Sequence, residues 1–162
     1  MNVPIKYLPF KLSFKDKKKQ SKQLKKSRKA YKKGIYITRK PIKSYTSKKS
    51  QHIINAEKIY KIKNLAINNE LIKKTGCSRK ALDQIVKKGM GAYYSSGSRP
   101  NQTPHSWGIA RLASSITGGK AASVDYNILE QGCNNNSKAL KLAKKSRIKN
   151  NYGTRKVPKR KL

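Results

Sequence analysis

The spacing of apolar residues along the middle of the chain is typical of short amphipathic helices. Leu112, Ala113 and Ile116, for example, recur three or four positions apart, which places them on one helix face. The helices that this spacing predicts cover 51–63, 69–74, 79–87, 104–117 and 120–130. The sequence therefore predicts a mainly α fold, a small helical module of about four to five short helices.

Capping and stop signals mark the ends of these helices. Ser13 followed by Asp16 is a variant of the capping box and predicts a further helix over 15–33, which Gly34 ends. The other signals are predicted N-caps at Ser50, Ser78 and Thr103, and predicted stops at Gly89, Gly118 and Gly132. Between them, 95–102 is rich in Gly, Ser and Pro and predicts a tight loop before a helical hairpin.

The beginning of the chain has a different pattern. Two prolines in 3–10 favour an extended anchor segment, and 153–158 has the same character near the other end. The helix predicted at 15–33 has few apolar residues and many like charges four positions apart. We therefore expect it to become ordered only against a polyanion or an acidic protein surface. A short β-like run follows at 35–38.

The charge of the chain is extreme and unevenly distributed. Of 162 residues, 41 are Lys or Arg and 6 are Asp or Glu, which gives a formal charge of +35. Residues 1–50 hold 18 basic and 1 acidic residue and 134–162 hold 11 and none, whereas 89–133 hold 3 and 2. Self-repulsion at this charge favours a partner that supplies negative charge.

The charge distribution predicts three consecutive segments. They are a basic N-terminal arm at 1–50, a helical core at 51–133 that includes the loop and hairpin of 88–133, and a basic C-terminal tail at 134–162. The arm residues expected to bind a polyanion or a partner are Lys17, Lys18, Lys19, Lys25, Lys26, Arg28, Lys29, Lys32, Lys33, Lys141, Lys144, Lys145, Arg147, Arg155, Lys156 and Arg160.

Catalytic and metal chemistry find little support in the sequence. The acidic residues are scattered singly, and the glycine pairs do not have the spacing of a phosphate-binding loop. Cys77 and Cys133, with only two histidines in the chain, do not suggest a zinc site; two free thiols is the favoured interpretation and one disulfide the alternative. We expect no enzyme activity, metal, cofactor or small-molecule substrate, and neither a signal peptide nor a transmembrane segment.

Five polar and aromatic residues of the central block are candidate structural clips: Arg99, His105, Trp107, Arg111 and Asp125. An arginine in a nearly neutral block can pair with Asp125 or with carbonyl groups, or stack on Trp107. A ligand pocket formed by these side chains is the weaker alternative. The segments on either side of Gly76 also have a helix-turn-helix outline, for which two packed core helices is the favoured interpretation.

Parts of the central block resemble a known domain. They are the stretch from Gly91 to Trp107, the Ala110–Arg111 pair, and Gly118 to Ala122 followed by Asp125. Together they resemble an uncharacterised domain shared by giant nucleocytoplasmic DNA viruses and some tailed phages. The resemblance implies a viral origin and no particular chemistry. The excess of 33 Lys over 8 Arg fits the coding bias of an AT-rich genome.

These observations lead to two hypotheses of function. The first is a non-enzymatic virion structural protein, a minor capsid protein on the inner face of a large DNA virus shell, made in the host cytoplasm and tied by its basic arms to major and other minor capsid proteins. The second is a sequence-independent DNA-binding or genome-packaging protein, whose lysines neutralise phosphates. A ribosomal-type protein and an enzyme are weaker alternatives.

Overall fold

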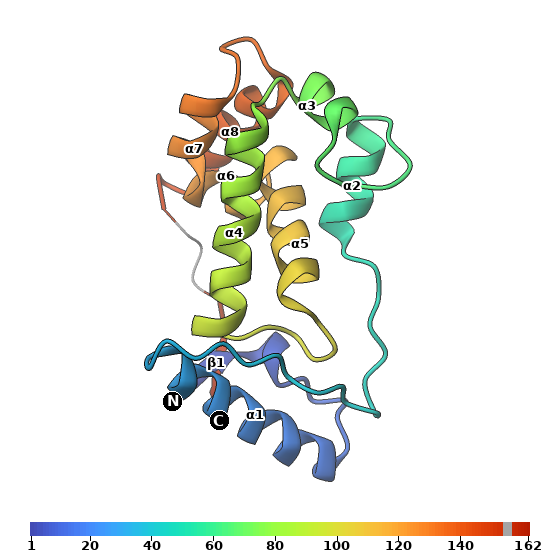
Figure 1. Cartoon of the computed structure of the whole chain (residues 1–162), viewed down its shortest axis with the longest axis vertical. Coiled ribbons are helices and arrows are strands. Elements are labelled where there is room, and N and C mark those ends of the chain that lie inside the picture. Colours follow the sequence, from blue (N-terminus) through green and yellow to red (C-terminus); the bar gives the residue numbers. More distant parts are fainter. Residues whose placement is uncertain (154–156) are drawn as a thin grey trace. The chain divides into compact units, whose positions relative to one another are not determined.

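The computed structural model describes residues 1–153 and 157–162, and over them the protein is mainly helical, as predicted (Figure 1). Its elements are β1 (Asn2–Pro4), the 3-10 helix η1 (Ile5–Tyr7), α1 (Phe14–Tyr31), α2 (Gln51–Ile59), α3 (Asn69–Thr75), α4 (Arg79–Ser95), α5 (Pro104–Ile116), α6 (Lys120–Val124), α7 (Tyr126–Gly132), α8 (Lys138–Lys149) and β2 (Lys159–Lys161). Contacts divide the chain into two compact units. The first unit combines 1–48, 90–107 and 156–162, and the second combines 49–89 and 108–155.

The first unit joins the two ends of the chain. Strands β1 and β2 pair in antiparallel register, with Val3 opposite Arg160. The unit also holds two small apolar clusters, one of Val3, Tyr7 and Leu24 and another of Leu8, Leu12 and Ile42. Leu162 packs against both clusters. The two prolines of the predicted anchor segment thus lead into a short strand and a 3-10 helix that contribute to a core.

This packing corrects the expectation that 15–33 is ordered only against a partner. Helix α1 buries Gln20, Leu24 and Ser27, which are spaced four and three positions apart on one face. Leu24 is the one leucine of this buried face. The polar side chain of Gln20 can be buried beside it because its amide donates a hydrogen bond of 3.1 Å to the carbonyl of Tyr7. The run 35–38, predicted as β-like, is not a strand.

The second unit contains most of the buried apolar residues. Leu71, Leu82, Ile85, Leu112, Ile116 and Leu129 are fully buried or nearly so. Helices α4 and α5 lie side by side (Figure 1) and approach closely at Gly89, where a Cβ atom would lie 2.6 Å from the Cα of Gly108. Gly89 was predicted to end the helix that begins at Arg79, but α4 continues through it to Ser95. The glycine is instead the residue whose missing side chain lets α5 come close.

Two further differences from the sequence expectation lie in this unit. The single helix predicted at 120–130 is two helices, α6 and α7, that meet at the buried Asp125. Helix α8 lies in the segment predicted to be a basic tail. It is capped by Ser137 and buries Ala139, Leu140, Ala143 and Ser146, a stripe of small residues that the surrounding lysines obscure in the sequence.

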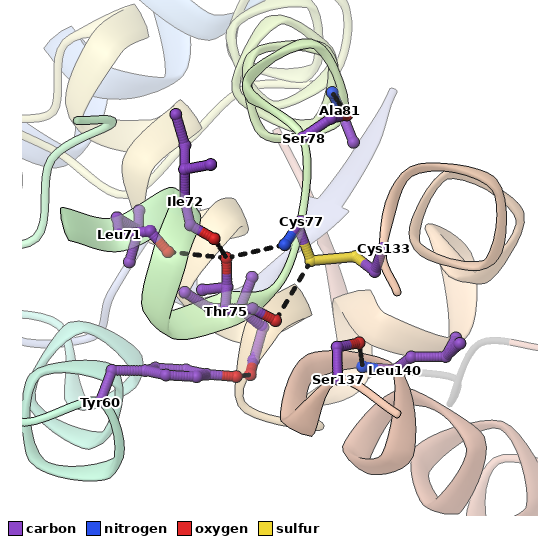
Figure 2. Close-up of a disulfide and its surroundings, with 11 residues drawn as sticks. Tyr60, Leu71, Ile72, Thr75, Cys77, Ser78, Ala81, Cys133, Ser137 and Leu140 are labelled. Atoms are coloured by element: carbon purple, nitrogen blue, oxygen red, sulfur yellow. Dashed lines mark hydrogen bonds between the residues drawn. A yellow bond between two sulfur atoms is a disulfide. The ribbon is translucent and has the colours of Figure 1, made fainter. Parts of the chain in front are cut away.

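Cys77 and Cys133 form a disulfide, which corrects the interpretation of two free thiols. Figure 2 shows the bond between the turn that precedes α4 and the end of α7. Backbone hydrogen bonds from Ser78 to Gly132 and from Asn134 to Gly76 flank it, so the two cysteines form an antiparallel bridge with their Cα atoms 3.9 Å apart. Backbone pairing therefore brings the thiols together.

Candidate polyanion-binding surface

Helix α1 has one buried face and one face of exposed lysines. Lysines recur on the exposed face three or four positions apart, which keeps them in line along the helix. They are Lys15, Lys18, Lys22, Lys25 and Lys29, and all five are exposed. At a rise of about 1.5 Å per residue the row extends over roughly 21 Å. We call these five residues the lysine row.

The first unit has almost no negative charge to balance this row. It contains 22 basic residues and one acidic residue, Asp16. Asp16 accepts a hydrogen bond of 2.8 Å from the backbone N–H of Ser44, and its own N–H donates to the hydroxyl of Ser13 at the helix N-terminus. The hydrogen bonds with Ser44, together with nearby lysines, lower the pKa of Asp16. The single carboxylate is therefore engaged at the start of α1 and does not neutralise the rest of the row.

Some of the predicted arm residues have structural roles instead. Lys19 donates a hydrogen bond of 3.0 Å to the carbonyl of Pro41, and Arg28 donates one of 3.1 Å to the carbonyl of Asn2. Arg160 donates to the carbonyl of Leu8 and stacks over Phe10 with its Cζ atom 4.5 Å from the ring centroid. These three cations hold segments of the first unit together.

The remaining predicted residues are mostly exposed. In the first unit, Lys18, Lys25, Lys26, Lys29, Lys32 and Lys33 are exposed and Lys17 is half-buried. In the second unit, α8 exposes Lys141, Lys144 and Lys145. The Cζ atom of Arg147, in contrast, lies over the rings of Tyr126 and Tyr152, 4.2 and 4.7 Å from their centroids. Arg155 and Lys156 lie outside the described residues. The prediction that these cations bind a polyanion or a partner stays a prediction.

A buried arginine that sequence reasoning missed supports the first unit. Arg39 stacks on Tyr93 with its Cζ atom 3.8 Å from the ring centroid. Its guanidinium donates hydrogen bonds to Ser27 and Ser98 at 2.9 and 2.8 Å and to the carbonyl of Tyr93 at 3.0 Å. Burial lowers the pKa of Arg39. The planar guanidinium of Arg39 thus links α1, α4 and the loop at Ser98 by hydrogen bonds to uncharged acceptors.

Replacing Arg39 by lysine is expected to lower the free energy of unfolding by about 2 kcal/mol. Lysine keeps the charge but cannot stack its ammonium flat on Tyr93 or reach both serine hydroxyls at once. Urea denaturation followed by circular dichroism measures the change. The matched control is Lys40→Arg at the exposed neighbouring position. A stability of Arg39→Lys equal to that of the wild type would contradict the assigned role.

In the second unit, the predicted clip between Arg111 and Asp125 is present. Arg111 makes a bidentate pair with the carboxylate, with Nε–Oδ2 and Nη2–Oδ1 distances of 3.0 and 2.8 Å. Ser115 donates to the same carboxylate at 2.8 Å, and the ammonium of Lys88 lies 3.1 Å from it. Burial alone would raise the pKa of Asp125, but the bonds and charge of Arg111, with Ser115 and Lys88, lower it.

The other predicted clips have different surroundings. Arg99 and His105 are exposed residues of the first unit, and neither is among the partners of Asp125. Trp107 packs edge-on against Tyr7 at 5.7 Å between ring centroids and next to the cluster around Leu24. Arg99, His105 and Trp107 belong to the first unit and Arg111 and Asp125 to the second, so the alternative of a pocket formed by all five stays a prediction.

Residues 1–153 and 157–162 contain neither a cluster of metal ligands nor a membrane-spanning helix. No group of three or more His, Cys, Asp or Glu side chains there could hold a metal ion. None of the helices in that part of the chain is long and apolar enough to cross a membrane.

The fold and this surface define a class of protein: a mainly α, disulfide-linked, strongly basic chain with a row of lysines on its first helix. The chain belongs to a family of unknown function, DUF5824, whose family model matches residues 4–148. The match extends from β1 into α8 and so covers far more than the resemblance noted in the central block. No curated protein and no solved structure matches the chain.

Proposed function

We propose that this protein is a non-enzymatic, sequence-independent nucleic-acid-binding protein, and that the lysine row of α1 binds the phosphate backbone. The observation that carries the proposal is the charge of the first unit, which has 22 basic residues and a single, already engaged, acidic one. Phosphates bound along the row would relieve the repulsion between its lysines and release condensed counterions. Lysine is suited to phosphate contacts, whereas the reading of base edges relies mainly on bidentate arginine. The excess of lysine therefore favours binding that does not depend on sequence.

The proposal is tested by salt titration of the full chain on duplex DNA. Replacing Lys18, Lys22, Lys25 and Lys29 by glutamine removes four charges and keeps the helix propensity of α1. If each lysine contacts one phosphate, the slope of log K against log salt falls in magnitude by about 3–4.

The matched control changes the same net charge elsewhere. Glutamine replaces Lys58, Lys63, Lys73 and Lys80, four exposed lysines of the second unit. This variant is expected to change the slope by less than about one. Equal losses in both variants would show that total charge, and not the lysine row, sets the binding. Wild-type protein that binds no DNA at low salt would overturn the proposal.

We further propose that the protein acts inside a virus particle. The resemblance of the central block to a domain of giant DNA viruses and tailed phages supports this setting, as does the lysine-rich composition. The disulfide between Cys77 and Cys133 adds a physical argument, because stable disulfides are rare in proteins that remain in the reducing cytosol. Mass spectrometry of purified virions is expected to detect the protein, and its absence from them would contradict the viral setting.

A minor capsid protein on the inner face of the shell is the second candidate. The exposed residues Phe10 and Phe14, 72% and 85% accessible, favour it because exposed apolar side chains can pack against capsid neighbours. Threading by the terminal arms has less support, since β1 and β2 pair within the chain. Stepwise disruption of virions distinguishes the two candidates: a nucleic-acid-binding protein stays with the genome, and a minor capsid protein stays with the shell.

A further inference from the structure

An aromatic cluster lies at the C-terminal end of the lysine row. The ring of Tyr36 packs edge-on against those of Tyr31 and Tyr94, with centroid distances of 5.9 and 5.1 Å. Tyr94 in turn packs edge-on against Tyr93 at 5.2 Å. We call Tyr31, Tyr36 and Tyr94 the tyrosine platform. All of its residues belong to the first unit.

The end of α1 determines where Tyr36 lies. Gly34 has a φ of +74°, and the N–H groups of Gly34 and Ile35 donate to the carbonyls of Tyr31 and Ala30. This is the hydrogen-bond pattern of a Schellman motif, which ends a helix and turns the chain back along it. The turn places Tyr36 beside Tyr31, which a continued helix would not do because the two positions are five residues apart.

Tyr36 is exposed and yet held in place. Tyr36 is 65% accessible and Tyr31 37% accessible, whereas Tyr93, against which Tyr94 packs, is fully buried. Arg39 stacks on Tyr93, and Tyr93 accepts a hydrogen bond of 2.9 Å from the backbone N–H of Arg39. An exposed ring with fixed neighbours loses little conformational entropy when a ligand stacks on it.

The charge around the platform favours an anionic partner. Lys29, Lys32 and Lys33 surround Tyr31 in the sequence and are exposed. Asp16, the one acidic residue of the first unit, lies in the first turn of α1, at the opposite end from Tyr31. A partner that presents flat aromatic groups together with closely spaced negative charges would therefore complement both features.

We propose that the tyrosine platform binds unstacked bases of single-stranded nucleic acid, while the neighbouring lysines bind its phosphates. This inference rests on the proposed function and names the form of nucleic acid that the surface prefers. In a duplex the base faces are stacked inside and unavailable, whereas a single strand can place a base on an aromatic side chain. Stacking is tolerant of sequence because every base has a π-face.

The test compares short single strands of deoxythymidylate and of uridylate with a duplex, using fluorescence anisotropy and the full chain at physiological ionic strength. Tyr36→Ala is expected to weaken single-strand binding by about 5- to 20-fold and to leave duplex binding within about 2-fold. Tyr36→Phe keeps the ring and is expected to bind as the wild type does. The two single strands separate a DNA partner from an RNA partner.

The matched control is Tyr152→Ala, which removes a ring of similar exposure, 68%, from the second unit. It is expected to leave single-strand binding unchanged. A photo-crosslinking strand that contains iodouracil supplies a readout that altered folding does not mimic. The crosslink is expected on Tyr36, in the tryptic peptide 34–39.

The outcomes separate this inference from the proposed function. Wild-type protein that binds duplex as tightly as single strands, with no effect of Tyr36→Ala, overturns the inference and leaves the proposed function standing. Equal losses for Tyr36→Ala and Tyr152→Ala also overturn it. Protein that binds neither form of nucleic acid overturns both, and would direct attention to a protein partner for the platform.

Discussion

Replacing Asp125 by asparagine is expected to lower the free energy of unfolding by about 3 kcal/mol. The carboxylate is fully buried and is bonded by Arg111, Ser115 and Lys88. Asparagine is nearly the same size, so it leaves no cavity, but it cannot satisfy a bidentate guanidinium. The loss stays near the lower limit for a broken buried pair because Arg111 and Lys88 are partly exposed and can be hydrated.

Urea denaturation at neutral pH measures this change. The control is Glu130→Gln, which also neutralises an acidic residue, five positions further along the chain. Glu130 is exposed, and its neutralisation is expected to change the free energy of unfolding by less than about 0.5 kcal/mol. A double variant with Arg111→Met should lose less than the sum of the two single variants. Additive losses would show that Arg111 and Asp125 do not act as a pair.

The same carboxylate gives stability a pH dependence of known sign. The pKa of Asp125 is lower in the folded protein than the usual 3.8 of an aspartate side chain, so folding favours the charged form. Its contribution is present above about pH 4 and is lost as the pH falls through the folded pKa. Wild-type protein should therefore lose more stability on acidification than Asp125→Asn does, and parallel curves for the two proteins would contradict the shift.

The features that the sequence predicts correctly are local ones. Ser13 caps α1 as expected, Gly34 ends it, and Thr103 accepts a hydrogen bond from Ser106 at the start of α5. The pair of Arg111 and Asp125 is not local, since 14 positions separate the two residues. It could be predicted because their block contains few other charged residues that could pair with either one. Local spacing and scarcity of alternatives are therefore what made these predictions possible.

The features that the sequence does not predict depend on distant partners. Arg39 bonds Ser27, Tyr93 and Ser98, which are 12, 54 and 59 positions away, and no local pattern distinguishes it from the other arginines. The pairing of β1 with β2 joins opposite ends of the chain. Charge also misleads, because the lysines of 15–33 and of α8 suggest solvated arms although each helix buries a narrow stripe.

The disulfide carries the largest expected effect on stability. A disulfide stabilises a protein mainly by restricting the unfolded chain, and closing a loop of 56 residues corresponds to about 4 kcal/mol. Replacing both Cys77 and Cys133 by alanine is expected to lower the free energy of unfolding by that amount and the midpoint of thermal unfolding by roughly 10 °C. Circular dichroism of oxidised wild type and of the double variant measures both changes.

The folded structure itself should survive the loss of the bond. The backbone hydrogen bonds from Ser78 to Gly132 and from Asn134 to Gly76 do not involve sulfur, so the helical signal at room temperature should be the same in both proteins. Reductant supplies the control: it should lower the midpoint of the wild type to that of the double variant and leave the double variant unchanged. If the unfolded, unreduced wild type instead titrates with two free thiols, the cysteines are not linked, and a reducing compartment would suit the protein as well as an oxidising one such as a virion.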